Sequence, residues 1–419
     1  RSLSDIDSQP VPILNAATWL EAQQYSEELR YNGTFATRWN VTTGLYYFTN
    51  DLKYHERREA LGLLTPDGSP AQTQDGGSEY KVDTYAWFNS VDYDLNESWT
   101  LNAGLRYTYE KKEAKIASLS VNVNSPCNVV DGTCPFDFSD DEDWNSWSPK
   151  VGATYALEDD ALIYGYWTLG YRSGGYNLRN TAQDLVEFGP GPFDEEKVST
   201  YELGYKSELP GARGRLNVAA FYTEVDDMQR EVNLSDPISG VVQVIRNTAD
   251  AEIWGMEFDG TFSLLDNLIA IASVGYTDAS YTKVKFDLNG DNIIDNKDSD
   301  LNLPRAAEWT YSLGLNLDTE LGDWGYMTSR ISYAYRDDSA FTDSNLGTLN
   351  SADIVDAGID YHSPEGSWTL SLYGRNLLDE TMHGGDTQLP AMLGPVPLGG
   401  TFSPLIKGRI VGAELTYAF

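Results

Sequence analysis

The sequence predicts an all-β protein, a transmembrane antiparallel β-barrel, from three observations. Residues 405–419 (LIKGRIVGAELTYAF) alternate between an apolar and a mostly polar face and end on an aromatic residue, as a membrane-spanning strand would. About 15 strand-like runs follow one another along the chain. The connections between these runs alternate between short and long, which is typical of outer-membrane barrels with short periplasmic turns and long outer loops.

The expected strands are longer than those of most soluble domains. Alternation is clearest in LNAGLRYTY (101–109) and WTYSLGLNL (309–317), where apolar and polar residues occupy opposite faces. Crossing a membrane obliquely takes roughly 9–11 residues, whereas soluble strands usually have about 5–6. The runs lie at residues 25–32, 36–54, 79–93, 98–112, 147–157, 161–173, 196–208, 214–230, 241–263, 267–282, 305–318, 324–336, 352–362, 367–376 and 405–419.

The connections support the same architecture, because a β-sandwich or propeller has no reason to alternate their lengths. Residues 1–24, with Pro10 and Pro12, are predicted to be an irregular segment or an outer loop. The predicted long loops lie at residues 55–78, 113–146, 174–195, 231–240, 283–304, 337–351 and 377–404.

Composition excludes several classes of protein. The chain has 419 residues, 64 acidic and 29 basic, with a net charge of −35, and nucleic-acid binding requires a basic surface. No apolar run approaches the roughly 18 residues of a membrane helix. The mean hydropathy of −0.41 is compatible with a barrel, because half of each strand faces a polar lumen. The 27 Tyr and 11 Trp favour strands and interfacial aromatic belts.

Two pairs of residues near the middle of the chain allow specific predictions. Cys127 and Cys134 are expected to form a local disulfide in an exported protein, the alternative being two free thiols. Trp144 and Trp147 are expected to be belt aromatics that anchor the barrel, the alternative being sugar-stacking contacts. Three His residues without a His/Cys cluster make a zinc or haem site improbable.

The segment 287–298 (DLNGDNIIDNKD) resembles a twelve-residue calcium loop, and Ca²⁺ is the single cofactor that we expect. Six residues occupy the ligand positions, one of them through its backbone carbonyl. Asn292 replaces the usual Gly, and Asp rather than Glu ends the loop. The alternative is an acidic, solvated outer loop, and calcium would rigidify the loop rather than catalyse. The candidate ligands are Asp287, Asn289, Asp291, the carbonyl of Ile293, Asp295 and Asp298.

Several polar residues are expected to face the lumen and to contact one another or a plug: Arg106, Lys206, Glu202 and Glu414. Glu202 and Glu414 could also be interpreted as a hydrolytic carboxylate pair. Polar lumen residues are expected in any such barrel, and there is no nucleophile motif or phosphate-binding Gly loop. We therefore predict no enzyme and no catalytic residue. The glycines of SGGYN (173–177) are expected to form a turn.

Five ordered segments resemble the TonB-dependent outer-membrane receptors, whose barrels have 22 strands and a plugged lumen. The resemblance implies that residues 25–419 form the C-terminal portion of such a barrel, about 15 of 22 strands. It also implies that the plug and the TonB-coupling segment belong to an N-terminal part outside this sequence. The segments are YGYWTLGYRSGGYN (164–177), EKVSTYELGYKSEL (196–209), LNVAAFYTEVDDMQ (216–229), NTADAEIWGMEFDG (247–260) and YGRNLLDE (373–380).

The resemblance implies an outer-membrane active transporter of a Gram-negative bacterium, which imports a scarce substrate with TonB-derived energy. Ferric siderophores are the commonest substrate class of the family, and the implied partners are the TonB complex, outer-membrane lipid and lipopolysaccharide. In the family, a terminal aromatic such as Phe419 serves as a membrane-assembly signal. The alternatives are a passive porin-like channel and a structural barrel that acts as a scaffold for partner proteins. The sequence assigns no substrate-binding residue.

Overall fold

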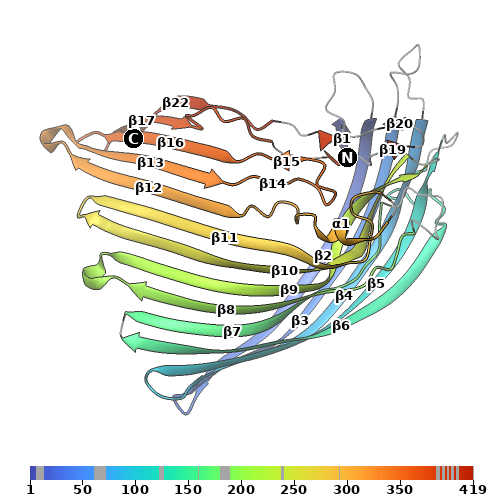
Figure 1. The fold of residues 1–419 in the computed structure, drawn as a ribbon, viewed down its shortest axis with the longest axis horizontal. Coiled ribbons are helices and arrows are strands. Elements are labelled where there is room, and N and C mark those ends of the chain that lie inside the picture. The colour runs from blue at the N-terminus through green and yellow to red at the C-terminus, as the bar shows by residue number, and fades with distance from the viewer. Residues whose placement is uncertain are drawn as a thin grey trace.

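The computed structural model is dominated by one antiparallel sheet of 16 strands, which curls along its length (Figure 1). Strands follow one another in the sheet in chain order, and β1 and β22 are its two edges. The structure describes residues 1–5, 14–60, 72–121, 127–158, 160–179, 189–236, 240–291, 293–383, 387–388, 392–393, 396–397, 401–402 and 405–418.

The sixteen strands of the sheet have the following bounds: β1 Ser2–Asp5, β2 Leu14–Phe35, β3 Trp39–Ala60, β4 Gln72–Asp94, β5 Trp99–Val121, β6 Phe138–Glu158, β7 Ala161–Arg172, β8 Glu196–Glu208, β9 Gly214–Asp236, β10 Gly240–Leu265, β11 Leu268–Val284, β12 Trp309–Glu320, β13 Tyr326–Arg336, β16 Ala352–His362, β17 Trp368–Arg375 and β22 Ile410–Tyr417. The connections contain the short elements α1 Asn296–Ser299, η2 Pro210–Ala212, η3 Gly322–Trp324, β14 Ser339–Ala340, β15 Thr348–Leu349, β18 Thr387–Gln388, β19 Met392–Leu393, β20 Val396–Pro397 and β21 Thr401–Phe402.

The all-β antiparallel fold is confirmed, and each of the fifteen predicted runs corresponds to one strand from β2 onwards. The structure differs at residues 1–24, which were expected to be irregular. They contain β1 and the first half of β2, which begins at Leu14. Pairing of the whole of β2 with β3, from Leu14 with Ala60 to Phe35 with Trp39, explains this strand. A polar sequence such as EAQQYSEE (21–28) remains extended when the neighbouring strand, here β3, provides its backbone hydrogen-bond partners.

Short turns lie at one end of the sheet and long connections at the other, in agreement with the prediction (Figure 1). The segment 231–240 is an exception, because β9 continues to Asp236 and β10 begins at Gly240. The prediction of a long loop there was wrong. Val232, Val242 and Val244 form a buried cluster on one face of these extensions, and that apolar alternation keeps them paired as strands.

Two rows of aromatic side chains border an apolar band on the outer face of the sheet. On each of four neighbouring strands two such residues are separated by eight positions, about 26 Å along a strand, comparable to the roughly 25 Å band of outer-membrane barrels. Ring centroids lie 4.2–5.1 Å apart between β3 and β4 and between β5 and β6, so the rings pack in pairs along each row. The residues are Trp39 and Tyr47, Tyr85 and Tyr93, Trp99 and Tyr107, and Trp147 and Tyr155.

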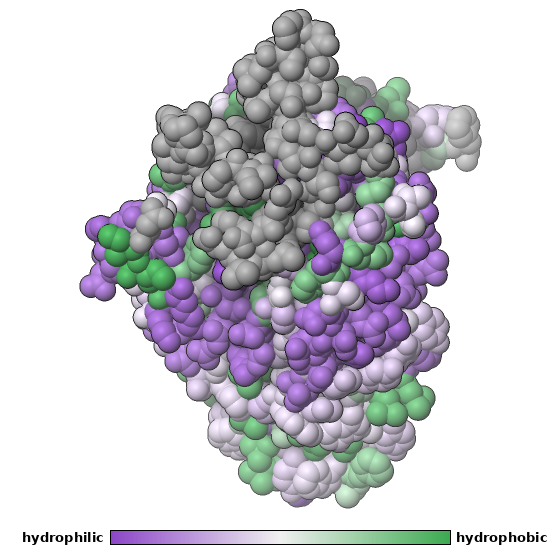
Figure 2. All heavy atoms as spheres, turned by 90° about the vertical axis from the view of Figure 1, so that its right-hand side faces the viewer, coloured by the Kyte–Doolittle hydropathy of each residue, from purple (hydrophilic) through white to green (hydrophobic). Residues whose placement is uncertain are grey.

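Buried side chains concentrate at the end of the sheet that carries the long connections. Ile116, Val129, Val242 and Ala249 are fully buried there, whereas Leu101 in the apolar band is 42% exposed. Figure 2 views this end, where hydrophilic residues cover much of the described surface. No helix among the described residues is long and apolar enough to cross a membrane.

Candidate functional site

The segment 173–179, which follows β7, crosses the concave side of the sheet at the long-connection end. The Arg179 guanidinium contacts Glu56 on β3 and Gln243 on β10. Six strands separate β3 from β10 in the sheet, so a segment that contacts both must lie inside the curl. We call this segment, together with the side chains that hold it, the mouth cluster: Glu56, Arg58, Glu110, Lys112, Ser173, Asn177, Arg179, Gln229 and Gln243.

Glu56 is the central anchor of the mouth cluster, and its side chain is almost completely buried. Arg58 Nε lies 2.5 Å from Oε1 and Arg179 Nε lies 3.0 Å from Oε2, while the Tyr54 hydroxyl also donates to the carboxylate. Burial raises the pKa of Glu56, but the two guanidinium groups outweigh it and lower the pKa to about 2. The carboxylate is therefore charged at neutral pH and holds two cations.

A second anchor ties the start of the segment to β5. Lys112 Nζ donates to Ser173 Oγ at 2.7 Å and to the Gly174 carbonyl at 2.6 Å, and it pairs with Glu110 at 2.8 Å. Ser173 Oγ also donates to Glu110. Burial raises the pKa of Glu110, but the hydrogen bonds from Lys112 and Ser173 outweigh it, so that this pKa is lowered. Charge-assisted bonds of this kind are the stronger class.

Asn177 and Gln229 attach the segment to the opposite wall. Asn177 Oδ1 accepts from the Ile245 amide at 2.6 Å, and its Nδ2 donates to the Ile245 carbonyl at 3.3 Å. The side chain thus substitutes for a strand partner of β10. Gln229 Nε2 donates to the carbonyls of Ser173 and Asp194. SGGYN does not form the predicted turn: Gly175 forms an antiparallel β-bridge with Phe193, and the stretch docks the segment inside the sheet.

Trp144 and Trp147 lie on opposite faces of β6, so the belt prediction holds for Trp147 alone. Trp147 is 54% exposed on the outer face and packs on Tyr107. Trp144 is buried, its ring lies edge-on to Tyr176, and Lys112 Nζ is 5.3 Å from its centroid. Their three-residue spacing itself assigns them to opposite faces of a strand, a signal that the sequence contained.

A second connection also folds onto the strand ends. Asp343, in the connection after β13, forms a bidentate pair with Arg230 of β9 at 2.8 and 3.1 Å and accepts from the Tyr281 hydroxyl. Sequence reasoning did not identify Asp343, Arg230 or Glu56 as site residues. Their contacts connect residues more than 60 positions apart, and a local sequence pattern cannot predict which distant residues will pair.

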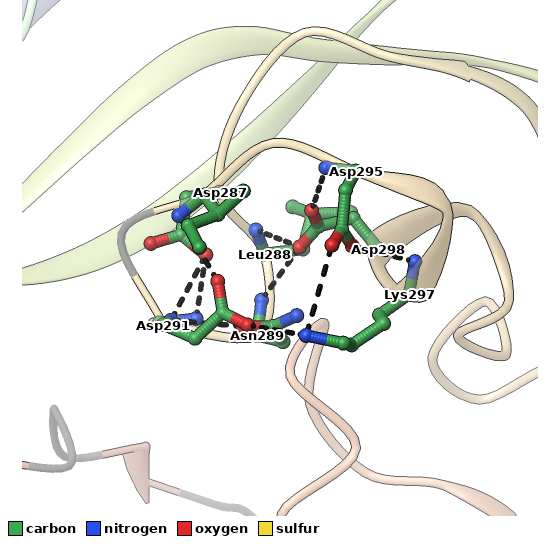
Figure 3. Close-up of polar contacts among 9 residues, drawn as sticks. Asp287, Leu288, Asn289, Asp291, Asp295, Lys297 and Asp298 are labelled. Carbon is green, nitrogen blue, oxygen red and sulfur yellow. Dashed lines mark hydrogen bonds and ion pairs between the residues drawn. The ribbon is translucent and has the colours of Figure 1, made fainter.

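The predicted calcium loop is compact, but its oxygens bind the loop's own donors (Figure 3). Asp298 is fully buried and accepts from the amides of Leu288, Asn289 and Asp295 at 2.9–3.0 Å. Asp287 accepts from the Gly290 amide at 2.8 Å. The loop is thus closed by carboxylate-to-amide bonds, and Asp295 also caps α1 through a capping box.

A lysine takes the central position among the remaining carboxylates of this loop. Lys297 Nζ lies 3.1 Å from Asp291 Oδ2 and 3.6 Å from Asp295 Oδ2, and the hydrogen bond from Lys297 is the main cause of a lowered pKa at Asp291. Within the described residues, no group of three or more His, Cys, Asp or Glu side chains is arranged to hold a metal ion. The observed geometry does not fit Ca²⁺, and calcium binding remains a prediction that requires Lys297 to move.

The remaining predicted residues are placed as follows. Cys127 and Cys134 form a disulfide with a Cα–Cα distance of 4.8 Å, next to the buried Val129. Glu202 on β8 and Glu414 on β22 line different recesses of the inner wall, so the structure does not bring them together as a carboxylate pair. Phe419 lies outside the described residues.

Arg106 and Lys206 face the concave side, where they lie over aromatic rings. The Arg106 guanidinium is 5.5 Å from the Tyr46 ring centroid, and Lys206 Nζ is 5.3 Å from that of Tyr164. Glu202 accepts hydrogen bonds from the hydroxyls of Tyr164 and Tyr166, each at 2.7 Å. These residues therefore form a polar inner wall, as predicted.

Comparison with known proteins identifies one family. Residues 4–377 match the family described as TonB dependent receptor-like, beta-barrel. The chain is 27% identical over 179 residues to the pesticin receptor of Yersinia pestis, a match that spans 42% of this chain and 23% of that protein. It is 24% identical over 309 residues to the rhizobactin receptor of Rhizobium meliloti, a match that spans 61% of this chain and 40% of that protein.

The fold is also that of a solved receptor. The structure of the ferric yersiniabactin uptake receptor FyuA from Yersinia pestis superimposes with a TM-score of 0.74 at 19% identity. The superposition covers 96% of this chain and 55% of that one. The chain therefore spans about half the length of this relative, and its curved sheet corresponds to part of a barrel wall.

Proposed function

The chain belongs to the TonB-dependent receptor β-barrel family, and from this membership we propose that it serves in the energy-dependent import of a ferric siderophore across the outer membrane. Members of this family are transport receptors of the Gram-negative outer membrane. The observation that carries the proposal is the match over residues 4–377, together with relatives that are named as receptors for rhizobactin, ferric aerobactin and ferric yersiniabactin.

The mouth cluster supports a role in substrate entry. It ties the segment 173–179 across the concave side through hydrogen bonds and ion pairs rather than through an apolar core. Polar contacts of this kind can be exchanged with a polar ligand, because their donors and acceptors are also those of a metal chelate. In this proposal, residues 25–419 form the C-terminal portion of the barrel wall.

The partners in this proposal follow from the same membership. Energy reaches the receptor from the TonB complex. Outer-membrane lipid contacts the apolar band between the aromatic rows, where Leu45, Val151 and Leu203 are each more than half exposed, and lipopolysaccharide contacts the outer row.

The test is uptake of ⁵⁵Fe by an iron-starved Gram-negative host that lacks its own receptors and expresses the full-length protein. We expect accumulation with a cognate ferric chelate, and loss of that accumulation in a strain without TonB. Accumulation that persists without TonB would instead favour the passive porin-like channel. No accumulation with ferric hydroxamates, catecholates, carboxylates or phenolates would overturn the proposal.

A further inference from the structure

We infer that Asn289, in the connection after β11, is a modification site, where a reaction within the loop converts the side-chain amide to a carboxylate. The sequence contains two Asn-Gly pairs, at residues 32–33 and 289–290. In such a pair the backbone nitrogen of the glycine can attack the side-chain carbonyl of the asparagine, because no Cβ hinders the approach. The structure prepares the second pair for this reaction and holds the first pair away from it.

The two reacting groups of the second pair are each held by a neighbouring residue of the loop (Figure 3). The Gly290 amide, which is the nucleophile, donates to Asp287 Oδ1 at 2.8 Å, so a carboxylate is in place to accept its proton. Asn289 Oδ1 accepts from the Asp291 amide at 2.8 Å. This bond polarises the carbonyl and stabilises the negative charge that develops on its oxygen during the attack.

The backbone around this pair is anchored at the asparagine and open at the glycine. The fully buried Asp298 accepts from the amides of Leu288 and Asn289 at 2.9 and 3.0 Å. Gly290 is exposed, has a φ of +79°, and a Cβ added to it would meet nothing within 4 Å. The carbonyl that is attacked is therefore held in place, while water can reach the product.

The reaction consumes water, releases ammonia and involves no oxidant or reductant. The Gly290 nitrogen forms a bond to Asn289 Cγ, and its proton passes to Asp287. The Cγ–Nδ2 bond then breaks, and Nδ2 takes up that proton and leaves as ammonia. Water opens the resulting cyclic imide at either of its two carbonyls. Cleavage of the new Cγ–N bond gives aspartate, whereas cleavage of the original backbone C–N bond gives isoaspartate.

The first Asn-Gly pair provides an internal control. Asn32 and Gly33 lie within β2, where they pair with Thr42 and Val41 of β3. Asn32 Oδ1 accepts from the Thr42 hydroxyl at 2.8 Å. For the Gly33 nitrogen to attack the side chain, the backbone of Asn32 must rotate out of its extended conformation, and the ladder of backbone hydrogen bonds opposes this rotation. We therefore expect little conversion at Asn32.

Conversion changes the charge of the loop at its most acidic turn. A carboxylate at position 289 adds a negative charge between Asp287 and Asp291, and like charges this close repel each other. Lys297 already pairs with Asp291 and Asp295, at 3.1 and 3.6 Å. The turn should therefore loosen after conversion, while Asp298 keeps its hydrogen bonds to the loop. The loop of an aged receptor thus differs in charge and rigidity from that of a newly made one.

The test is peptide mass spectrometry of the full-length receptor, incubated in detergent and in water enriched in ¹⁸O. The peptide that contains Asn289 should take up ¹⁸O roughly tenfold faster than the peptide that contains Asn32. It should also react faster than a synthetic peptide of residues 287–298, in which the reacting groups are not held. Asp287→Asn should slow the conversion roughly tenfold. The matched control Asp295→Asn leaves the reacting groups untouched and should leave the rate unchanged.

Two results would overturn the inference: slower conversion of Asn289 in the folded receptor than in the synthetic peptide, or equal rates in the natural protein and Asp287→Asn. Hydrogen exchange of the Leu288 amide checks that Asp287→Asn keeps the loop folded, because that amide is held by Asp298. If this variant unfolds the loop, the comparison of the natural protein with the peptide decides, since it needs no substitution. Neither result depends on which substrate the receptor transports.

Discussion

The two halves of the long strands behave differently, although they share one backbone and one periodicity. In the first half of β5, odd-numbered apolar residues point outward, and Leu101 is 42% exposed. In the second half, the even-numbered Ala114 and Ile116 are buried, at 1% and 0% exposure, and Ala117 is buried after the bulge opposite Asp75 and Gly77. The apolar positions therefore change face where the strand leaves the aromatic row.

The change of face follows from what surrounds each half. Between the aromatic rows lipid lies outside and water inside, so apolar side chains face outward. Beyond the outer row water lies outside as well, and the hydrophobic effect turns apolar side chains toward the docked connections. Trp144 and Trp147 on β6 show the same change within three residues. The half of the strands that carries the long connections is therefore built like a soluble protein. Mutations of its buried residues should destabilise it as they would the core of a soluble domain.

The largest expected effect is that of Glu56→Ala, which leaves Arg58 and Arg179 without their shared carboxylate. Removing one partner of a buried ion pair typically costs about 3–5 kcal/mol. Chemical unfolding of the full-length receptor in detergent should show this loss. The control Glu28→Ala breaks the exposed pair with Arg30 at 2.6 Å and should cost less than about 1 kcal/mol. Equal costs for the two variants would contradict the soluble-like description of the loop end.

Trp144→Ala is expected to destabilise the receptor by about 3 kcal/mol, because it leaves a cavity beside Tyr176 and Lys112. Trp147→Ala should cost less, since its ring packs on Tyr107 at the lipid boundary. Quenching of tryptophan fluorescence by brominated lipid checks the assignment of faces. The fluorescence of each residue is obtained by subtracting the spectrum of Trp144→Phe or of Trp147→Phe from that of the natural protein. Trp147 should be quenched and Trp144 should not.

Acidification should weaken the loop-end half through Glu56, whose pKa is lowered from 4.5 to about 2. A carboxyl with a lowered folded pKa contributes its full stabilisation above its unfolded pKa and loses it as pH falls through the folded value. The loss should therefore occur between about pH 4.5 and pH 2 and amount to about 3 kcal/mol. Comparing unfolding of the natural protein and Glu56→Gln over this range isolates the contribution. A constant difference between them would refute the prediction.

Gly204→Ala tests the inner wall of the lipid-level half. A Cβ at Gly204 would overlap the Tyr164 ring that lies over it, and the ring must shift away from Glu202, at a cost of about 1–2 kcal/mol. Gly104→Ala is the matched control, because its Cβ would meet nothing closer than Lys150 Cβ at 3.6 Å. Unfolding midpoints in detergent compare the two, and a cost for Gly104→Ala equal to that of Gly204→Ala would argue against the ring contact.

The smallest expected effect is that of calcium on the loop 287–298. Calcium must displace Lys297 from Asp291 and Asp295, so binding should be weak in the natural protein and at least threefold tighter in Lys297→Met. Calorimetry on the full-length receptor measures both affinities. The control Lys283→Met leaves the loop carboxylates untouched. If neither the natural protein nor Lys297→Met releases or absorbs heat on addition of calcium, the loop is not a calcium site.

Much of the fold could be predicted from local patterns. Alternation such as that of Leu101 to Tyr109 follows from the period of a strand, and clusters such as Pro210–Arg213 mark the short turns. The extent of the strands beyond the aromatic rows was underestimated, because charged residues such as Glu113 and Asp141 suggest a loop when their pairing is unknown. In the sheet Lys111 forms ion pairs with Glu113 on its own strand and with Asp141 on the neighbouring β6.

The sequence by itself determined the class of fold, the order of the strands, the face that meets lipid and the family. Only the tertiary structure decided that the segment 173–179 is held between Glu56 and Gln243. Arg179, which contacts both, lies 123 positions from Glu56 and 64 positions from Gln243 along the chain. The tertiary structure also decided that Lys297 pairs with two carboxylates of a loop with calcium-like spacing. The physical reason is that periodicity encodes each strand and its neighbour, whereas these contacts depend on the curvature accumulated over many strands.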